Sequence, residues 1–329
     1  MKPSLSRRRI HTVLAGLTAL VLATGVWRLV EGGDATSDCG SLARSPAMVS
    51  ALGPGHSGDM TCPELGDAVK SATTGDSSGP RPEERANAMK KVFNAVSDSV
   101  EVGRGLPAEI RRPLAEALAG YTDDLQEVLD GTNSRYHDAG GPSGAVWKGT
   151  DGFHVSVYKT SLVPVLRALS ESPEAYAVLR NAQTDWGART LAAAPADSSD
   201  AALMTLVTVN AAALGTYDGI AADIVRAKKG TSGEEWADTV YGSLREPSRF
   251  LPRAVPSTAV SDEITRGWRE TLSTVPDNER IDHLKKQGTH TCGAWSDAHE
   301  FTAEKRAACV SDCRGRAEGS YQDVVRSLS

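Results

Sequence analysis

The residues best able to form covalent bonds are five cysteines, at positions 39, 62, 292, 309 and 313. All five follow residues 1–30, which are interpreted below as an export signal. Cysteines that are exported from the cytoplasm are expected to oxidise. An odd number leaves one free thiol or one intermolecular bond. Cys309 and Cys313 are four residues apart on an expected helix, where a bridge between them would be strained. We predict a Cys39–Cys62 bridge and a bridge from Cys292 to either Cys309 or Cys313.

Histidines near these cysteines offer an alternative, a metal site. His290 and His299 flank Cys292 and precede Cys309 and Cys313, and together they contain enough nitrogen and sulfur ligands for tetrahedral zinc. Their spacing fits no zinc motif, and an oxidising compartment favours disulfides over thiolate ligands. We therefore expect neither a metal nor another cofactor.

Other potentially catalytic residues lack the neighbours that catalysis requires. His299-Glu300 has no second histidine four residues later, as a helical zinc protease needs. Ser57, within GHSGD, lacks the glycine two positions later that marks a nucleophile elbow. A helix would point the neighbouring carboxylates of Asp123-Asp124 and Glu234-Glu235 in different directions, so we expect them on solvated faces. No catalytic residue is assigned, and the sequence favours a non-enzymatic protein.

Residues 1–30 are predicted to be a signal-anchor or a signal peptide. A basic segment, Met1–Arg9, is followed by the apolar run of His11–Trp27, as in export signals. Thr12–Val30 reaches the length of a bilayer span if Arg28 extends its guanidinium to the outer interface. Potential cleavage sites are weak, so we favour a single-pass anchor with a cytoplasmic N-terminus and the remaining chain outside. A cleaved signal and a secreted protein are the alternative.

The charge balance argues against nucleic acid as a partner. Five of the 36 basic residues lie in the first thirty positions, which hold no acidic residue. The remaining chain therefore carries 31 basic against 42 acidic residues. Binding to phosphates needs clustered Lys and Arg, and no such cluster occurs outside the leader.

Composition and periodicity predict a mainly α protein in several parts. Residues 31–82 are rich in Gly, Ser and Pro and are expected to form a flexible tether with one short helix near Pro63–Ala72. Apolar residues at helical spacing then predict a helical hairpin over residues 83–132. A Gly-rich connection over 133–152 separates it from the main, multi-helix bundle-like domain, residues 153–329, which ends in the Cys-containing region.

Local signals place particular elements within this main domain. Alternating residues over Phe153–Tyr158 are compatible with a short strand. Ser172-Pro173-Glu174 is typical of a helix start, and Ser198-Ser199-Asp200 precedes the most apolar helix. That helix contains the uncharged run Ala201–Tyr217, which we interpret as a core helix, with a stored membrane-inserting segment as the alternative.

The runs RANAMKKVF, LPAEIRRPLAEALAGYTDDLQEVL and LVPVLRALSESPEAYAVLRNAQTDW carry a resemblance to exported proteins. This part, Arg85–Trp186, resembles helical exported proteins of Streptomyces-type actinobacteria, some of them encoded beside WXG-type (type VII) secretion components. The resemblance implies a helical exported protein and assigns no activity or functional residue.

Together these features favour a membrane-anchored extracytoplasmic helical protein that acts by binding another envelope or secreted protein. One alternative is a secreted effector or toxin with a membrane-active helical domain. A further alternative is an extracytoplasmic hydrolase whose site is assembled from scattered residues.

Overall fold

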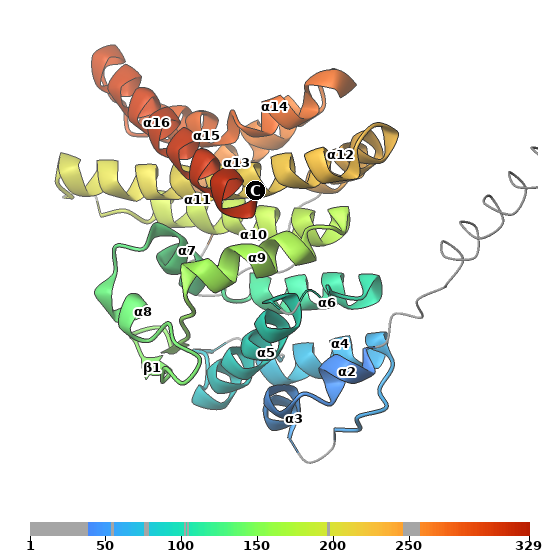
Figure 1. Cartoon of the computed structure of the whole chain (residues 1–329). Helices are drawn as coiled ribbons and strands as arrows, with labels where there is room; N and C mark the ends of the chain where they lie inside the picture. The colour runs from blue at the N-terminus through green and yellow to red at the C-terminus, as the bar shows by residue number, and fades with distance from the viewer. Residues whose placement is uncertain are drawn as a thin grey trace, which may run out of the picture. The chain divides into compact units, whose positions relative to one another are not determined.

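The computed structural model describes residues 39–53, 56–75, 79–101, 103, 105–195, 198–245 and 257–329. The predicted leader, residues 1–30, and the first residues of the predicted tether lie outside these ranges. The described residues form mainly α-helices, as predicted, and one short pair of antiparallel strands (Figure 1). In chain order the elements are α2 (Gly40–Ala43), α3 (Pro46–Leu52), α4 (Cys62–Thr73), α5 (Glu83–Glu101), α6 (Ala108–Ala119), α7 (Thr122–Asp130), α8 (Ser134–Asp138), β1 (Trp147–Lys148), β2 (Phe153–His154), α9 (Lys159–Leu169), α10 (Pro173–Ala192), α11 (Asp200–Lys228), α12 (Thr231–Leu244), α13 (Ala259–Leu272), the 3-10 helix η1 (Asp277–Glu279), α14 (Arg280–Leu284), α15 (Gln287–Ala298) and α16 (Ala303–Leu328).

Helix α10 lies between two groups of helices (Figure 1). It packs against α6, α7 and α9 from the first half of the chain and against α11, α12, α13 and α15 from the second half. Its start is as predicted, because the Ser172 side chain accepts a hydrogen bond from the backbone N–H of Ala175. Polar Arg180 and Gln183 are fully buried together with apolar side chains such as Leu179. The helix is therefore enclosed on all sides and does not present a single apolar face.

Two clusters of buried apolar side chains form the core. The first extends from Cys39, which precedes α2, to Val324 in α16 and includes side chains of α3 to α14. The second cluster contains side chains of α15 and α16, of the last turns of α10 and of the first half of α11. Because the first cluster includes residues from both sides of the connection 133–152, that connection does not separate two cores. The predicted division into a hairpin, 83–132, and a main domain, 153–329, is therefore not seen.

The segment predicted to be a flexible tether, 31–82, differs from that expectation between Cys39 and Thr73. It contains α2, α3 and α4, and the side chains of Met48, Leu65 and Val69 are buried. The predicted helix near Pro63–Ala72 is present as α4, whose first turn carries a reciprocal capping box between Thr61 and Glu64. These three short amphipathic helices bury apolar surface by packing on α5 and α6. Composition alone had not indicated this packing.

The predicted hairpin over 83–132 is also wrong in its pairing. The second predicted helix is interrupted at Gly120 and Tyr121 and forms α6 and α7. Helix α5 packs mainly on α3, α9 and α4, while α6 packs mainly on α4 and α10. The apolar faces of the two predicted helices therefore pack on other partners and not on each other.

Helix α11 contains the uncharged run of Ala201–Tyr217 and continues to Lys228. Ser199 caps it, as predicted, by accepting a hydrogen bond from the backbone N–H of Ala202. Leu203 and Leu214 are buried, which agrees with a core helix, whereas Leu206 is half-buried at the margin of the second cluster. No helix in the described ranges is long and apolar enough to cross a membrane.

Candidate functional site

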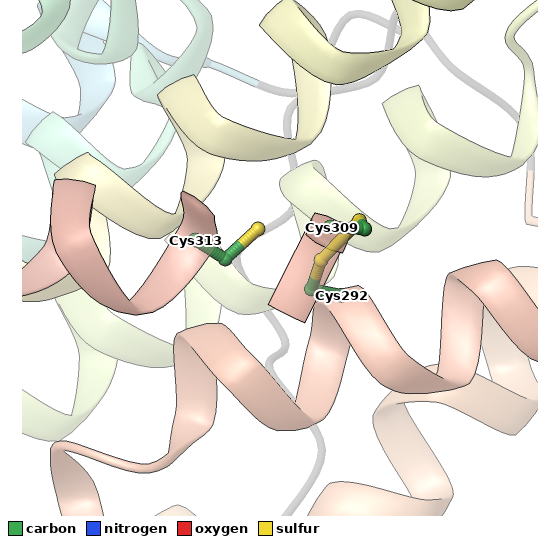
Figure 2. A group of neighbouring side chains, drawn as sticks. All are labelled: Cys292, Cys309 and Cys313. Atoms are coloured by element: carbon green, nitrogen blue, oxygen red, sulfur yellow. A yellow bond between two sulfur atoms is a disulfide. The ribbon is translucent and has the colours of Figure 1, made fainter. Parts of the chain in front are cut away.

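Three cysteines meet where α15 and α16 pack together (Figure 2). Cys292 lies on α15, and Cys309 and Cys313 lie one turn apart on α16. Thr302 caps the start of helix α16, because its side chain accepts a hydrogen bond from the backbone N–H of Lys305. Because residues four apart share one face of a helix, both α16 cysteines are directed toward α15 and the core.

Two disulfides are present among the described residues. Cys39 is bonded to Cys62, which joins the start of α2 to the start of α4. Cys292 is bonded to Cys309, which joins α15 to α16. These are pairings that the sequence predicts, with Cys309 as the partner of Cys292 and Cys313 as the remaining thiol.

The remaining thiol is enclosed by apolar side chains. Cys313 and both sulfurs of the neighbouring disulfide belong to residues with 0% exposure. The Cys313 thiol donates a weak hydrogen bond to the backbone carbonyl of Val207 on α11, with 3.8 Å between sulfur and oxygen. Burial, with a smaller contribution from the negative charge of Asp312, raises the pKa of the Cys313 thiol to about 12. The thiol is therefore protonated at neutral pH.

The zinc site considered as an alternative is not assembled in this arrangement. The three cysteine sulfurs lie within 4.8 Å of one another, but two of them are bonded to each other and are not thiolate ligands. Among the described residues, no histidine or carboxylate joins them within that distance. The His290 ring lies beside Trp268, with centroids 5.7 Å apart, and Nδ1 of His299 lies 3.0 Å from the carbonyl oxygen of Trp295.

A second polar cluster surrounds Asp124, which sequence reasoning expected on a solvated face. Asp124 is 1% exposed, and all its acceptor positions are used. Its Oδ1 accepts from the Tyr136 hydroxyl at 2.6 Å and faces Nδ1 of His154 at 2.8 Å. Its Oδ2 accepts from Nη1 of Arg81 at 2.6 Å and from the Val155 backbone N–H at 3.3 Å. The solvated-face prediction is therefore wrong here, because four residues from three separate segments converge on this one carboxylate.

Arg81 binds both neighbouring carboxylates, since its Nη2 lies 2.9 Å from Oδ1 of Asp123. Burial and the adjacent charge of Asp124 raise the pKa of Asp123 to about 6, in opposition to the attraction of Arg81.

By contrast, the pair Glu234-Glu235 is exposed, as predicted. Ser57 is likewise exposed, and its hydroxyl accepts a hydrogen bond from the backbone N–H of Asp59.

His154 is held between carboxylates on both sides of its ring. Nδ1 faces Asp124, and Nε2 lies 2.9 Å from Oδ1 of Asp151. The hydrogen bond to Asp124 raises the pKa of His154 and outweighs the opposing effect of burial. Both ring nitrogens face carboxylate oxygens, and this arrangement favours the charged imidazolium, which donates from both nitrogens.

Neighbouring contacts fix the segment that carries His154. The β1–β2 turn requires Gly152, whose φ is +137° and whose added Cβ would lie 2.4 Å from the backbone nitrogen of Arg81. Lys90 is buried and donates to the carbonyl oxygens of Ala139, Gly140 and Ser156. Burial lowers the pKa of Lys90 to about 8, and the three carbonyls favour its charged form. These contacts join residues too far apart in sequence to be recognised as a motif.

An open groove of about 440 Å³ lies between the first half of α11 and α16. Met204, Thr205 and Thr208 line it from α11. The hydroxyls of Thr205 and Thr208 donate to carbonyls within their own helix, which leaves their oxygens able to accept hydrogen bonds. From α16 the groove is lined by a charged pair and two small residues: Ser311, Asp312, Gly315 and Arg316. The lining therefore combines apolar, accepting and charged groups beside Cys313.

The features described so far are the three cysteines of α15 and α16, the charged residues around Asp124 and the open groove between α11 and α16. The resemblance to exported actinobacterial proteins stays a prediction. No known family model, no curated protein and no solved structure matches this chain.

Proposed function

We propose that this chain is an extracytoplasmic, membrane-anchored helical protein that acts by binding another protein of the envelope or of the secreted fraction. The observation that carries the proposal is the pair of disulfides, Cys39–Cys62 and Cys292–Cys309. Disulfides persist in oxidising compartments and are rare in the cytosol. They agree with an export signal in residues 1–30, which would leave the helical part outside and attached.

The groove between α11 and α16 is the surface that we assign to the partner. Its volume of about 440 Å³ accommodates several side chains, and it is open to solvent. Asp312 and Arg316 offer opposite charges one helical turn apart, while Met204 offers an adaptable apolar surface. Such a mixture suits a polypeptide segment with both apolar and charged side chains, because recognition of this kind relies on apolar contacts oriented by a few polar ones.

Location is tested with the full chain in intact cells that express it. External protease should degrade the helical part, and a membrane-impermeant thiol reagent should leave Cys39 and Cys62 unlabelled until they are reduced. A cytoplasmic protein of known location serves as the control for cell integrity. Protection of the helical part from protease in intact cells would contradict the proposal.

Binding is tested with a photo-crosslinking amino acid placed at Thr205, in the groove, or at Thr239, on α12. The two positions are matched, since both threonines are exposed and both donate to the carbonyl four residues earlier. We expect a discrete envelope or secreted protein to be crosslinked from Thr205 and not from Thr239. The purified partner should bind the wild type and T239R but bind T205R at least tenfold more weakly. Equal crosslinking from both positions, or equal binding by both variants, would refute the groove as the binding surface.

A further inference from the structure

Cys313 is close enough to the Cys292–Cys309 disulfide to take part in its chemistry. The three sulfurs lie within 4.8 Å of one another, and the free thiol approaches the disulfide from within α16 itself (Figure 2). Cys309 and Cys313 occupy consecutive turns of one face, so Cys292 on α15 meets both of them. An odd number of cysteines leaves one free thiol, but it does not require this thiol to lie beside a disulfide. The position of Cys313 is therefore an additional observation.

We propose that Cys313 is an internal exchange partner for Cys292, so that α15 and α16 can be joined through either of two cysteines one helical turn apart. In the exchange, the Cys313 thiolate attacks Sγ of Cys292. The Cys292–Cys313 bond forms as the Cys292–Cys309 bond breaks, and the electron pair leaves on Sγ of Cys309. The proton lost by Cys313 is regained at Cys309, so the step consumes no external oxidant or reductant.

The unfolded chain has little preference between the two bridges. The loop closed by Cys292–Cys309 spans 17 residues, and the alternative loop is four residues longer. Loop-closure entropy changes the ratio of the two pairings by a factor of only about 1.4 over this difference. The pairing is therefore decided by native packing, in which Cys313 is bound to the Val207 carbonyl of α11.

The same packing explains why one pairing persists in the folded protein. The attacking species is the thiolate, and burial keeps the Cys313 thiol protonated at neutral pH. Exchange is therefore slow while the cluster is enclosed, and it becomes faster when α16 separates from α11. The proposal concerns the cysteines alone and is independent of what binds in the groove.

The test is the disulfide connectivity of the full chain in C309S, C313S and C292S. Free thiols are alkylated in acid-quenched, denatured samples, and the peptides are mapped without reduction. Cleavage before Asp312 separates Cys309 from Cys313, so the two pairings give different linked peptides. We expect C309S to form Cys292–Cys313 with no more than one chain in ten left unbridged, and C313S to keep Cys292–Cys309.

C292S is the matched control, because its Cys309 and Cys313 should both be alkylated. The Cys39–Cys62 bridge in every variant reports that oxidation and folding have taken place. As a second measurement, reduced wild type is reoxidised while still unfolded, where native packing cannot select a pairing, and both linked peptides should appear, each at a tenth of the total or more. The proposal is overturned if C309S retains Cys39–Cys62 while Cys292 and Cys313 stay free. It is also overturned if reoxidised wild type yields the Cys292–Cys309 peptide alone.

Discussion

Gly215 of α11 lies directly against the backbone of Ala317 of α16. A Cβ atom on Gly215 would stand 2.1 Å from the carbonyl oxygen of Ala317, a distance that real structures do not show. One turn further along α11, a Cβ on Gly219 would meet the carbonyl of Tyr321 at 2.9 Å. These two glycines allow the helix axes to approach closely, which explains how α16 packs along α11 with few large side chains buried between them.

We expect G215A to destabilise the protein by about 1–3 kcal/mol, because the added methyl group must push α16 away or strain its backbone. The control is G319A on α16, where a Cβ meets no atom within 4 Å. There the same change should stabilise the fold by up to about 1 kcal/mol, since alanine favours a helix more than glycine. Denaturant unfolding measures both variants, and equal effects would contradict the close packing.

A buried ion pair connects α10 to α11. Nη1 of Arg180 lies 2.6 Å from Oδ1 of Asp218, and the side chains are 0% and 3% exposed. Arg180 also donates to the Tyr176 hydroxyl, to Gln287 and to the Leu284 carbonyl. Each charge is therefore compensated, and these contacts link four helices, α10, α11, α14 and α15.

We expect D218A to cost about 3–5 kcal/mol, because it leaves the Arg180 charge buried without its partner. The double variant R180M/D218L should recover at least half of that loss, since it removes both charges and keeps the volume. R266A serves as the control, because Arg266 pairs with exposed Glu263 and Glu270 and should change stability by less than about 1 kcal/mol. Thermal unfolding tests this ranking, and a double variant no more stable than D218A would contradict it.

Local signals in the sequence predict helix ends well. Ser172 and Ser199 were identified as caps, and both accept the expected hydrogen bond from the third helical residue. The bridge Cys39–Cys62 was also predictable, because the alternatives were few. The caps involve residues that are close in sequence, and disulfide formation is restricted to the five cysteines.

Partners that come from distant segments could not be predicted. Asp124 was expected in solvent, yet it is bound by Arg81, Tyr136 and His154, none of which lies at a recognisable spacing from it. Composition likewise misled for Cys39–Thr73, since glycine and serine in the connections hid three short helices with buried apolar faces. Both errors arise because a single sequence reveals the spacing of apolar residues within a helix or strand, but not which other element that helix or strand packs against.

The Asp124 cluster should make stability depend on pH through His154. Its pKa is raised in the folded protein, so its charged form contributes stability that is fully present below the unfolded pKa of about 6.5. This contribution is lost as the pH rises through the folded pKa. The charged groups that face His154 are Asp123, Asp124 and Asp151, with Arg81 bound to the first two.

We expect H154Q to be less stable than the wild type by about 1–3 kcal/mol at pH 6, because hydrogen bonds to a charged group are lost. The difference should shrink steadily as the pH is raised toward 9. The charge of His154 itself lowers the pKa of Asp123, which is about 6, so the titration of Asp123 contributes to the difference at the lower pH values. A difference that is constant over this range would show that His154 does not carry the expected charge.

The last prediction concerns α11 and distinguishes a core helix from a membrane-inserting segment. Leu214 is 1% exposed, whereas Leu206 is half-buried at the margin of the core. L214A should therefore leave a cavity and cost about 2–5 kcal/mol, a large part of the 5–15 kcal/mol that stabilises a typical domain. L206A should cost clearly less, because its surroundings can collapse onto the site and part of it already contacts water. Thermal unfolding measures both variants, and leakage of dye from anionic liposomes is recorded for them and for the wild type. We expect a lowered Tm for L214A and no leakage from any of the three, since the apolar residues of α11 are already used in packing. Dye release by the wild type, together with little loss of stability in L214A, would instead favour the membrane-active alternative.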